Sequence, residues 1–198
     1  MCKHHRIIHR AIDVVLVLMV AISIAATLSG CGTMSMNGSN GDPTFSDLEA
    51  MLNRESGMNQ QISIVVGHLY GDETNVGAYT LADDDTHIYV TPPMKRWYEQ
   101  GIVTHSMMAL IVGHELGHIS HHGKATRGGP SEEIFSDYYG LLFIEEAKSD
   151  GYSINLREAI SIWRLPQRSA PASASHPSSE SRYQRLKEKL DQWERQGK

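Results

Sequence analysis

The sequence has few cysteines and no excess of positive charge. Cys2 and Cys31 are the only cysteines among 198 residues, too few for a disulfide-rich scaffold or a four-cysteine zinc site. Acidic residues outnumber basic ones by 23 to 18, which excludes a nucleic-acid binder that depends on a strong overall basic charge. The mean hydropathy of −0.33 excludes a protein with many membrane spans. We therefore expect one globular domain with a short appendage.

The N-terminal apolar run is too short for a typical membrane span. It covers residues 14–28, whereas a spanning helix needs about 20 apolar residues. Basic residues precede it and Leu28-Ser29-Gly30-Cys31 ends it. This order predicts a secretory signal peptide over residues 1–30, with an uncleaved single-span anchor as the alternative.

The end of this segment is similar to the bacterial lipobox, in which the cysteine is acylated and becomes the first mature residue. The likeness implies lipid attachment at Cys31 and a membrane as partner. Because Gly32 rather than an aspartate follows, it favours the outer membrane, with the protein facing the periplasm. Residues 31–43 are rich in Gly, Ser and Asn and are predicted to form a flexible tether before a domain over residues 44–198.

Hydrophobic periodicity predicts an α+β fold, with the strands before most of the helices. The predicted strands cover residues 62–66, 76–81 and 87–91. The first helix is expected to start near Ser46 as its N-cap, and the other predicted helices cover residues 94–100, 105–121, 131–149, 157–164 and 183–196. The last helix is amphipathic and can dock on its own domain or on a second copy, so the oligomeric state is left open.

Residues 114–118 read His-Glu-Leu-Gly-His, an H-E-x-x-H motif inside the predicted apolar helix 105–121. Residues four apart share one helical face about 6 Å from each other. His114 and His118 can therefore converge on one zinc ion, with Glu115 beside its open coordination position. Two histidines and a glutamate are otherwise costly to bury. We expect one zinc ion per chain, rather than a solvated polar stripe or a satisfied pair of core histidines.

The predicted third metal ligand is Glu133, on the following helix. Glu133 would complete a His₂Glu site and leave the fourth position to water or substrate. Asp137 lies four residues later on the same face and is expected to fix the tautomer of a ligand histidine. Glu133 is preferred to Glu132 because only Glu133 has an acid four residues later. The alternative is that both glutamates only stabilise a helix N-terminus electrostatically.

Four stretches together resemble the HtpX-like and CAAX-prenyl-endopeptidase-like zinc metallopeptidases, which are peptidase family forty-eight within the gluzincins. They are residues 75–79 with 87–91, residues 113–123, residues 133–137, and residues 176–182 (H-P-S-S-E-S-R), which match an H-P-x-x-x-x-R motif. The resemblance implies a zincin-like, mainly helical metalloprotease domain with a small antiparallel sheet before the active-site helix. Only residues 119–132 separate the histidines from Glu133, fewer than is usual in the family, which predicts either a more open cleft or a missing lid.

The predicted activity is zinc-dependent hydrolysis of peptide bonds. Zinc lowers the pKa of bound water to about 7 and polarises the scissile carbonyl, while Glu115 takes the water's proton and passes it to the leaving amine. The resemblance adds that His176 donates to the oxyanion and that Arg182 anchors its loop or the substrate backbone. A polypeptide substrate can pair with an edge strand, which we expect at Val76, Gly77, Ala78 and Tyr79. The implied role is the clipping of misfolded envelope proteins.

Two other functions fit the same residues. A lipoprotein adaptor or assembly factor can keep a metalloprotease fold without turnover, since fold does not determine function. The intact Glu115 argues against this alternative, because a binding module needs the two histidines at most. The third hypothesis is a structural zinc site whose fourth ligand is His121 or His122.

Overall fold

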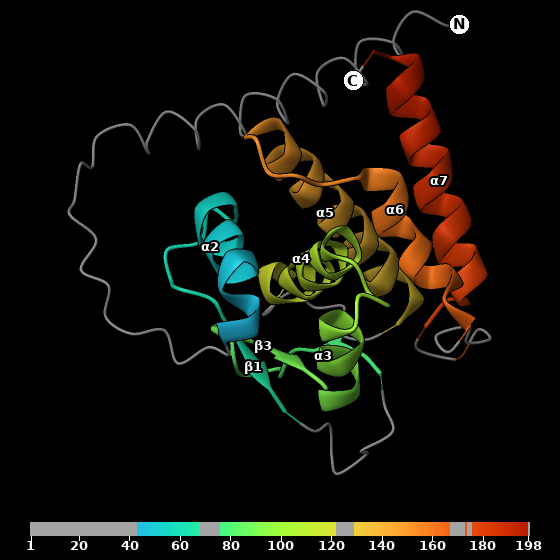
Figure 1. Cartoon of the computed structure of the whole chain (residues 1–198). Helices are drawn as coiled ribbons and strands as arrows, with labels where there is room; N and C mark the ends of the chain where they lie inside the picture. The colour runs from blue at the N-terminus through green and yellow to red at the C-terminus, as the bar shows by residue number, and fades with distance from the viewer. Residues whose placement is uncertain (1–42, 68–75, 122–128, 167–172, 174–175, 198) are drawn as a thin grey trace, which may run out of the picture. The chain divides into compact units, whose positions relative to one another are not determined.

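The computed structural model describes residues 43–67, 76–121, 129–166, 173 and 176–197. The predicted signal peptide, Cys31, and nearly all of the predicted tether lie outside these residues. The described part is a mixed α+β structure with far more helix than strand (Figure 1). Its elements are the 3₁₀ helix η1 (Pro43–Phe45), α2 (Ser46–Glu55), β1 (Ser63–Val66), β2 (Ala78–Tyr79), β3 (His87–Val90), α3 (Pro92–Glu99), α4 (His105–His121), α5 (Pro130–Ser149), α6 (Leu156–Ile160), the 3₁₀ helix η2 (Ser161–Arg164) and α7 (Ser179–Arg195).

The three strands form a mixed sheet, so the prediction of an antiparallel sheet is wrong in part. The strand order is β1-β3-β2, with β2 antiparallel to β3 and β1 parallel to β3. The hairpin between β2 and β3 follows from a local turn, in which Asp84 accepts hydrogen bonds from the backbone of Thr86 and His87. The position of β1 on the far side of β3 depends on a longer connection, which no local signal encodes.

The outer edge of β1 is covered by side chains of α2. Asn53 donates to the carbonyl of Ile62 and accepts from its N–H, as a neighbouring strand would. The buried Glu49 accepts from the N–H of Ile64. Because an uncovered edge strand invites pairing with another chain, these contacts close one edge of the sheet and leave β2 at the opposite edge.

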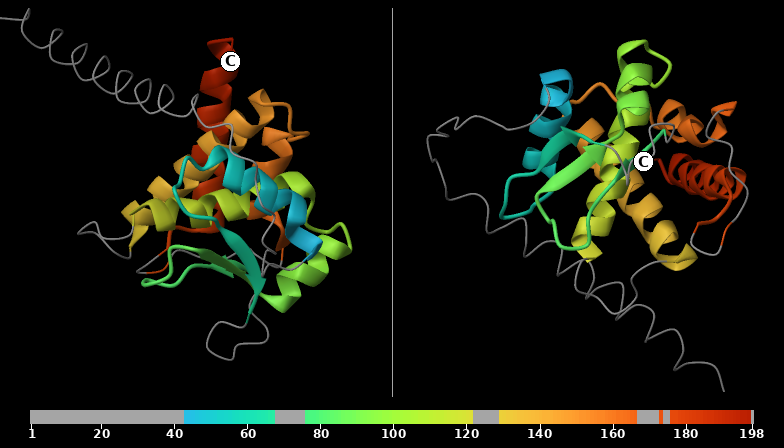
Figure 2. Two further views of the ribbon diagram at one scale, coloured as in Figure 1. Left: turned by 90° about the vertical axis from the view of Figure 1, so that its left-hand side faces the viewer. Right: turned by 90° about the horizontal axis from the view of Figure 1, so that it is seen from below.

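Helix α4 has the predicted bounds and forms the centre of the core. Apolar residues at helical spacing along it are buried, among them Met108, Ile111, Val112, Leu116 and Ile119. Helices α5 and α6 pack against α4, and α7 packs against α5 and α6 (Figure 2). Strands β2 and β3 also contact α4. Helix α4 therefore lies between the sheet and helices α5 and α6.

Helices α4 and α5 approach each other at glycines. A Cβ atom on Gly117 would lie 2.8 Å from the Cα of Ser136, closer than real Cβ contacts allow. Gly113 faces Gly140 across the same interface. The two helices can come this close only because side chains are missing there, and the close approach brings the first turns of α5 beside the histidines of α4.

Only α4 starts at the predicted residue, and the differences at α2 and α7 have a clear local cause. Ser46 is the first residue of α2 rather than its N-cap, because η1 runs directly into the helix and Phe45 occupies the cap position. Helix α7 starts at Ser179 instead of residue 183, since the side chain of Ser178 accepts a hydrogen bond from the N–H of Ser181 and caps the helix. Among the described helices, none has both the length and the apolar character needed to cross a bilayer.

Candidate metal centre

His114 and His118 project from the same face of α4 toward one point. Their Nε2 atoms are 3.1 Å apart, and their rings are nearly perpendicular, at 84°. His114 is buried and His118 is half-buried. Two imidazole nitrogens at this distance can share one metal ion, as the H-E-x-x-H spacing predicts.

Glu133, on the first turn of α5, completes a triangle of ligand atoms. Its Oε2 lies 3.4 Å from His114 Nε2 and its Oε1 lies 3.4 Å from His118 Nε2. Ligands about 2.0 Å from a tetrahedral zinc ion are about 3.3 Å from one another, so the three separations, which involve both carboxylate oxygens of Glu133, are compatible with a single ion held by these three residues. Glu133 Oε2 is buried and makes ion-pair contacts with His114 and Arg182 without a well-aligned hydrogen bond, which leaves it able to bind a cation. In the part of the chain that the structure describes, this is the only group of three such residues that can hold a metal.

A carboxylate also lies beside the Nδ1 atom of each histidine, on the side of the ring away from the shared point. Asp137 Oδ1 lies 3.1 Å from His114 Nδ1, which is the position predicted for it. Glu132 Oε1 lies 3.0 Å from His118 Nδ1. This second contact could not be predicted, because residue spacing alone does not show which way the side chain of Glu132 points.

Arg182 links α7 to the same carboxylates. Its guanidinium donates two hydrogen bonds to Asp137, from Nε to Oδ2 at 2.9 Å and from a terminal nitrogen to Oδ1 at 2.6 Å. It also lies 3.3 Å from Glu133 Oε2 and stacks over the ring of Trp163 at 3.5 Å. Arg182 is buried among these partners, a position that suits anchoring the start of α7. Trp163 is a further residue of this site that no sequence pattern indicated.

His176 lies at the edge of the site. Its side chain is 58% exposed, and its Nε2 is 3.4 Å from Glu133 Oε1. The backbone of His176 is held by Ser173, whose hydroxyl accepts from the N–H of His176. The H-P-x-x-x-x-R segment therefore brings both its histidine and its arginine to Glu133. The histidine is exposed and the arginine is buried.

Glu115 is buried next to His114 on α4. Its negative charge is one of the causes that raise the pKa of His118. By contrast, His121 packs its ring edge-on against Phe135 at 3.7 Å and does not belong to the ligand triangle. His122 lies outside the described residues.

The buried charges shift the pKa values of the histidines upward. Burial by itself would lower the pKa of His118, but hydrogen bonds to Glu133 and Glu132 and the nearby charge of Glu115 raise it to about 9. Burial likewise opposes the charge of His114, and its carboxylate partners raise its pKa above the ordinary value. The carboxylates around His114 and His118 therefore favour a positive charge at the two imidazoles.

The carboxylates shift in the opposite direction. Burial would raise the pKa of Glu133, but hydrogen bonds with the two histidines and the charge of Arg182 hold it well below its usual range. Hydrogen bonds with His114 and Arg182, together with the charges of these two residues, outweigh burial at Asp137 and lower its pKa. Both groups remain ionised at neutral pH, which is the state in which a carboxylate binds a metal or orients a histidine.

The predicted edge strand lies beside α4. Of the predicted strand 76–81, only Ala78 and Tyr79 form β2, in which Ala78 pairs with Val90 and Tyr79 with Tyr89. Thr91 ties the preceding residue in place, because its N–H donates to the carbonyl of Gly77 at 2.9 Å and its hydroxyl accepts from the N–H of Gly77 at 3.1 Å. Val76 precedes the strand and is partly buried against the core.

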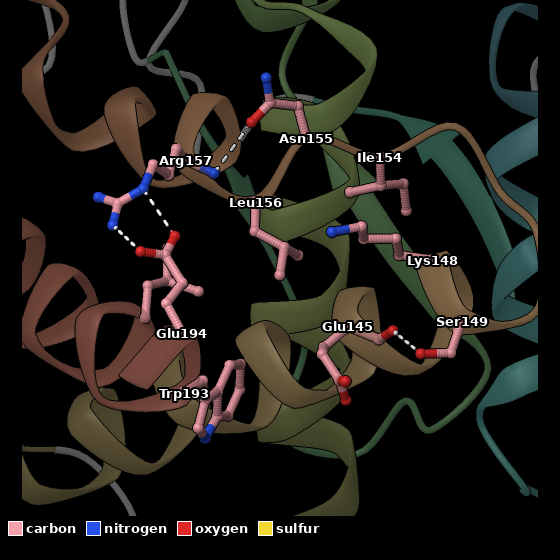
Figure 3. A pocket seen from close by; sticks show the side chains of 10 residues that line it. Glu145, Lys148, Ser149, Ile154, Asn155, Leu156, Arg157, Trp193 and Glu194 are labelled. Atoms are coloured by element: carbon pink, nitrogen blue, oxygen red, sulfur yellow. Dashed lines mark hydrogen bonds and ion pairs between the residues drawn. The ribbon is translucent and has the colours of Figure 1, made fainter. Parts of the chain in front are cut away.

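A pocket of about 460 Å³ lies elsewhere, between the C-terminal parts of α5 and α7 and the start of α6 (Figure 3). Glu145, which lines it, is twelve residues after Glu133 on α5, or about 18 Å along the helix. Arg157 at its rim is paired with Glu194 and Asp191. None of the predicted site residues lines this pocket.

The described site thus joins two imidazoles, three carboxylates and one guanidinium from α4, α5 and α7, with the exposed His176 at its rim. Such a set can bind a divalent cation, keep it in place through hydrogen bonds to its ligands, and hold a further carboxylate, Glu115, nearby for proton transfer. The chain matches no family model, no curated protein and no solved structure.

Proposed function

We propose that this protein is a zinc-dependent endopeptidase of the kind that the HtpX-like metallopeptidases represent. The observation that carries the proposal is the triangle formed by His114 Nε2, His118 Nε2 and the carboxylate of Glu133, with edges of 3.1, 3.4 and 3.4 Å. Two imidazoles and one carboxylate are a common ligand set of catalytic zinc, with the fourth position left open. We assign one zinc ion per chain to this triangle.

The residues around the triangle have roles that fit peptide hydrolysis. Zinc held there supplies an acidified water and a polarised carbonyl. Glu115 takes a proton from the attacking water and returns it to the leaving amine. His176, which is exposed beside Glu133, can donate to the oxygen of the scissile carbonyl.

Strand β2 supplies a place for an extended substrate. It forms the edge of the sheet opposite to the edge that α2 covers, and it contacts α4. A polypeptide that adds to this edge gains backbone hydrogen bonds with little dependence on its sequence. Unfolded or misassembled envelope proteins are therefore the proposed substrates.

The proposed location follows from the sequence of the N-terminal segment. We assign lipid attachment to Cys31 and place the domain on the periplasmic side of a bacterial outer membrane, with residues 1–30 removed. Mass spectrometry of the mature N-terminus tests this assignment. An acylated Cys31 supports it, whereas a chain that still begins at Met1 contradicts it.

The enzymatic proposal is tested with the full-length chain in detergent, with unfolded casein as substrate. The parent is expected to bind close to one zinc ion and to cleave casein. Glu115→Gln keeps the shape of the side chain but cannot act as a base, so it is expected to retain zinc and to lose at least 99% of the rate, in line with the 10²–10⁴-fold that a general base contributes. Glu188→Gln, an exposed change on α7, is the matched control and is expected to cleave like the parent.

Equal cleavage by the Glu115→Gln variant and the parent would rule out the assigned role of Glu115. A parent that binds zinc but cleaves nothing would favour the alternative of an adaptor or assembly factor that keeps the metalloprotease fold. A parent that binds no zinc would contradict the metal site itself.

A further inference from the structure

Glu132 faces inward although it lies on the first turn of α5. Its side chain is only 13% exposed, and its Oε1 is 3.0 Å from His118 Nδ1. A glutamate that only interacts with the helix dipole at a helix N-terminus stabilises the helix while its side chain remains exposed to water. The inward position therefore needs a second reason, and the contact with His118 provides it.

The contact repeats the arrangement at the other histidine. Asp137 lies 3.1 Å from His114 Nδ1, as Glu132 lies 3.0 Å from His118 Nδ1. In both rings the Nδ1 atom faces a carboxylate, and the Nε2 atom faces Glu133. A metal-ligating histidine typically donates its second N–H to such an acceptor, which fixes both the tautomer and the ring orientation.

His118 needs this support more than His114 does. The side chain of His114 is 7% exposed, and it is packed against Trp163 and Arg182. The side chain of His118 is 16% exposed, so fewer neighbours restrict its ring. A hydrogen bond from Nδ1 to a fixed carboxylate can supply the restraint that packing supplies for His114.

We infer that Glu132 is the positioning residue of His118: it accepts the Nδ1–H and so directs the Nε2 lone pair at the metal position. Two adjacent glutamates then have different roles at His118. Glu132 orients its ring, and Glu133 binds the same metal ion as its Nε2 atom. The inference rests on the metal site of the proposed function but not on peptide cleavage.

The test measures zinc affinity by competition with a chelator in the full-length chain. Glu132→Ala removes the acceptor and is expected to weaken zinc binding about 10–100-fold. Glu132→Gln keeps an amide oxygen that can still accept from Nδ1, so it should recover part of this loss. Glu145→Ala, on the same helix but outside the site, is the control and is expected to bind zinc within twofold of the parent. The visible spectrum of bound cobalt should shift in Glu132→Ala and stay unchanged in the control.

A zinc affinity of Glu132→Ala within twofold of the parent would overturn the inference. Equal losses in Glu132→Ala and Glu132→Gln, matched by equal losses in the free energy of unfolding of the zinc-free protein, would also overturn it, because they would show that Glu132 only stabilises α5. A parent that binds zinc but does not cleave casein contradicts the endopeptidase proposal and leaves this inference standing. A parent that binds no zinc overturns both.

Discussion

Gly140 of α5 lies directly against the backbone of His114 in α4. A Cβ atom on Gly140 would be 2.7 Å from the backbone nitrogen of His114 and 3.0 Å from the carbonyl carbon of Gly113. Both neighbours are helical backbone, which cannot move aside as the end of a flexible side chain can. The distance between the two helices that carry the candidate metal ligands is therefore set at a glycine that lies about two turns beyond Glu133.

Gly140→Ala is expected to destabilise the protein. Alanine favours a helix by about 1 kcal/mol over glycine, but forcing extra volume into a packed interface costs about 1–3 kcal/mol and more where backbone must move. Separation of the helices also lengthens the distances from Glu133 to the histidines. We expect a net loss in the free energy of unfolding, measured with urea in the presence of EDTA, and weaker zinc binding.

Ser149→Ala is the matched control, because Ser149 is exposed near the end of the same helix. Its effect should stay within about 0.5 kcal/mol, as for most surface changes. A Gly140→Ala variant as stable as the parent, with unchanged zinc affinity, would show that the helices can move apart without cost.

The parts of the fold that follow from local signals could be predicted from the sequence. Helix α4 has the predicted bounds, because its apolar residues repeat with helical period between clear ends. The hairpin of β2 and β3 follows from its turn. The parallel pairing of β1 with β3 could not be predicted, since it depends on the longer connection between these strands, which carries no local signal.

The same division applies to the metal site. His114 and His118 are four residues apart on one helix, so their side chains lie on the same face. Their convergence on one point could therefore be predicted. The contact of Glu132 with His118 depends on how α5 rotates against α4, and the glycines that set this packing carry no directional signal. The stacking of Arg182 on Trp163 joins α7 to η2, and neither residue belongs to a periodic pattern that would connect them.

Zinc is expected to stabilise the protein through His118. A ligand that binds only the folded state at a concentration 100 times its Kd adds about 2.7 kcal/mol to the free energy of unfolding. His118→Ala removes one of the three ligands and should abolish this zinc-dependent increment. His105→Ala changes a histidine at the start of the same helix, which contacts Tyr98 at 3.0 Å, and should keep the increment. Urea unfolding with zinc and with EDTA measures it, and an increment that persists in His118→Ala would exclude His118 as a ligand.

Arg182 is expected to be essential to the stability of the zinc-free protein. Arg182→Met leaves Asp137 and Glu133 buried without their cation, and the loss of one partner from a buried ion pair costs about 3–5 kcal/mol. Arg182→Lys keeps the charge but lacks the planar group that donates two hydrogen bonds to Asp137, so it should recover only part of the loss. Arg157→Met removes an exposed arginine with two acidic partners and should cost much less. Urea unfolding in EDTA compares the three, and equal losses for Arg182→Met and Arg157→Met would contradict this account.

Asp84 is expected to make the stability of the β2–β3 hairpin dependent on pH. Burial would raise its pKa, but hydrogen bonds from Thr86, His87 and Tyr89 lower it well below the ordinary value of 3.8. A carboxylate whose pKa is lower in the folded state contributes stability above the unfolded pKa and loses it as the pH falls toward the folded one. Asp84→Asn should therefore destabilise the protein at pH 7, and its difference from the parent should shrink as the pH falls below about 4. Asp83→Asn, an exposed neighbour, should show little difference from the parent at either pH. Urea unfolding in EDTA at pH 7 and pH 3 measures both variants, and a difference for Asp84→Asn that is the same at the two pH values would mean that its charge does not support the turn.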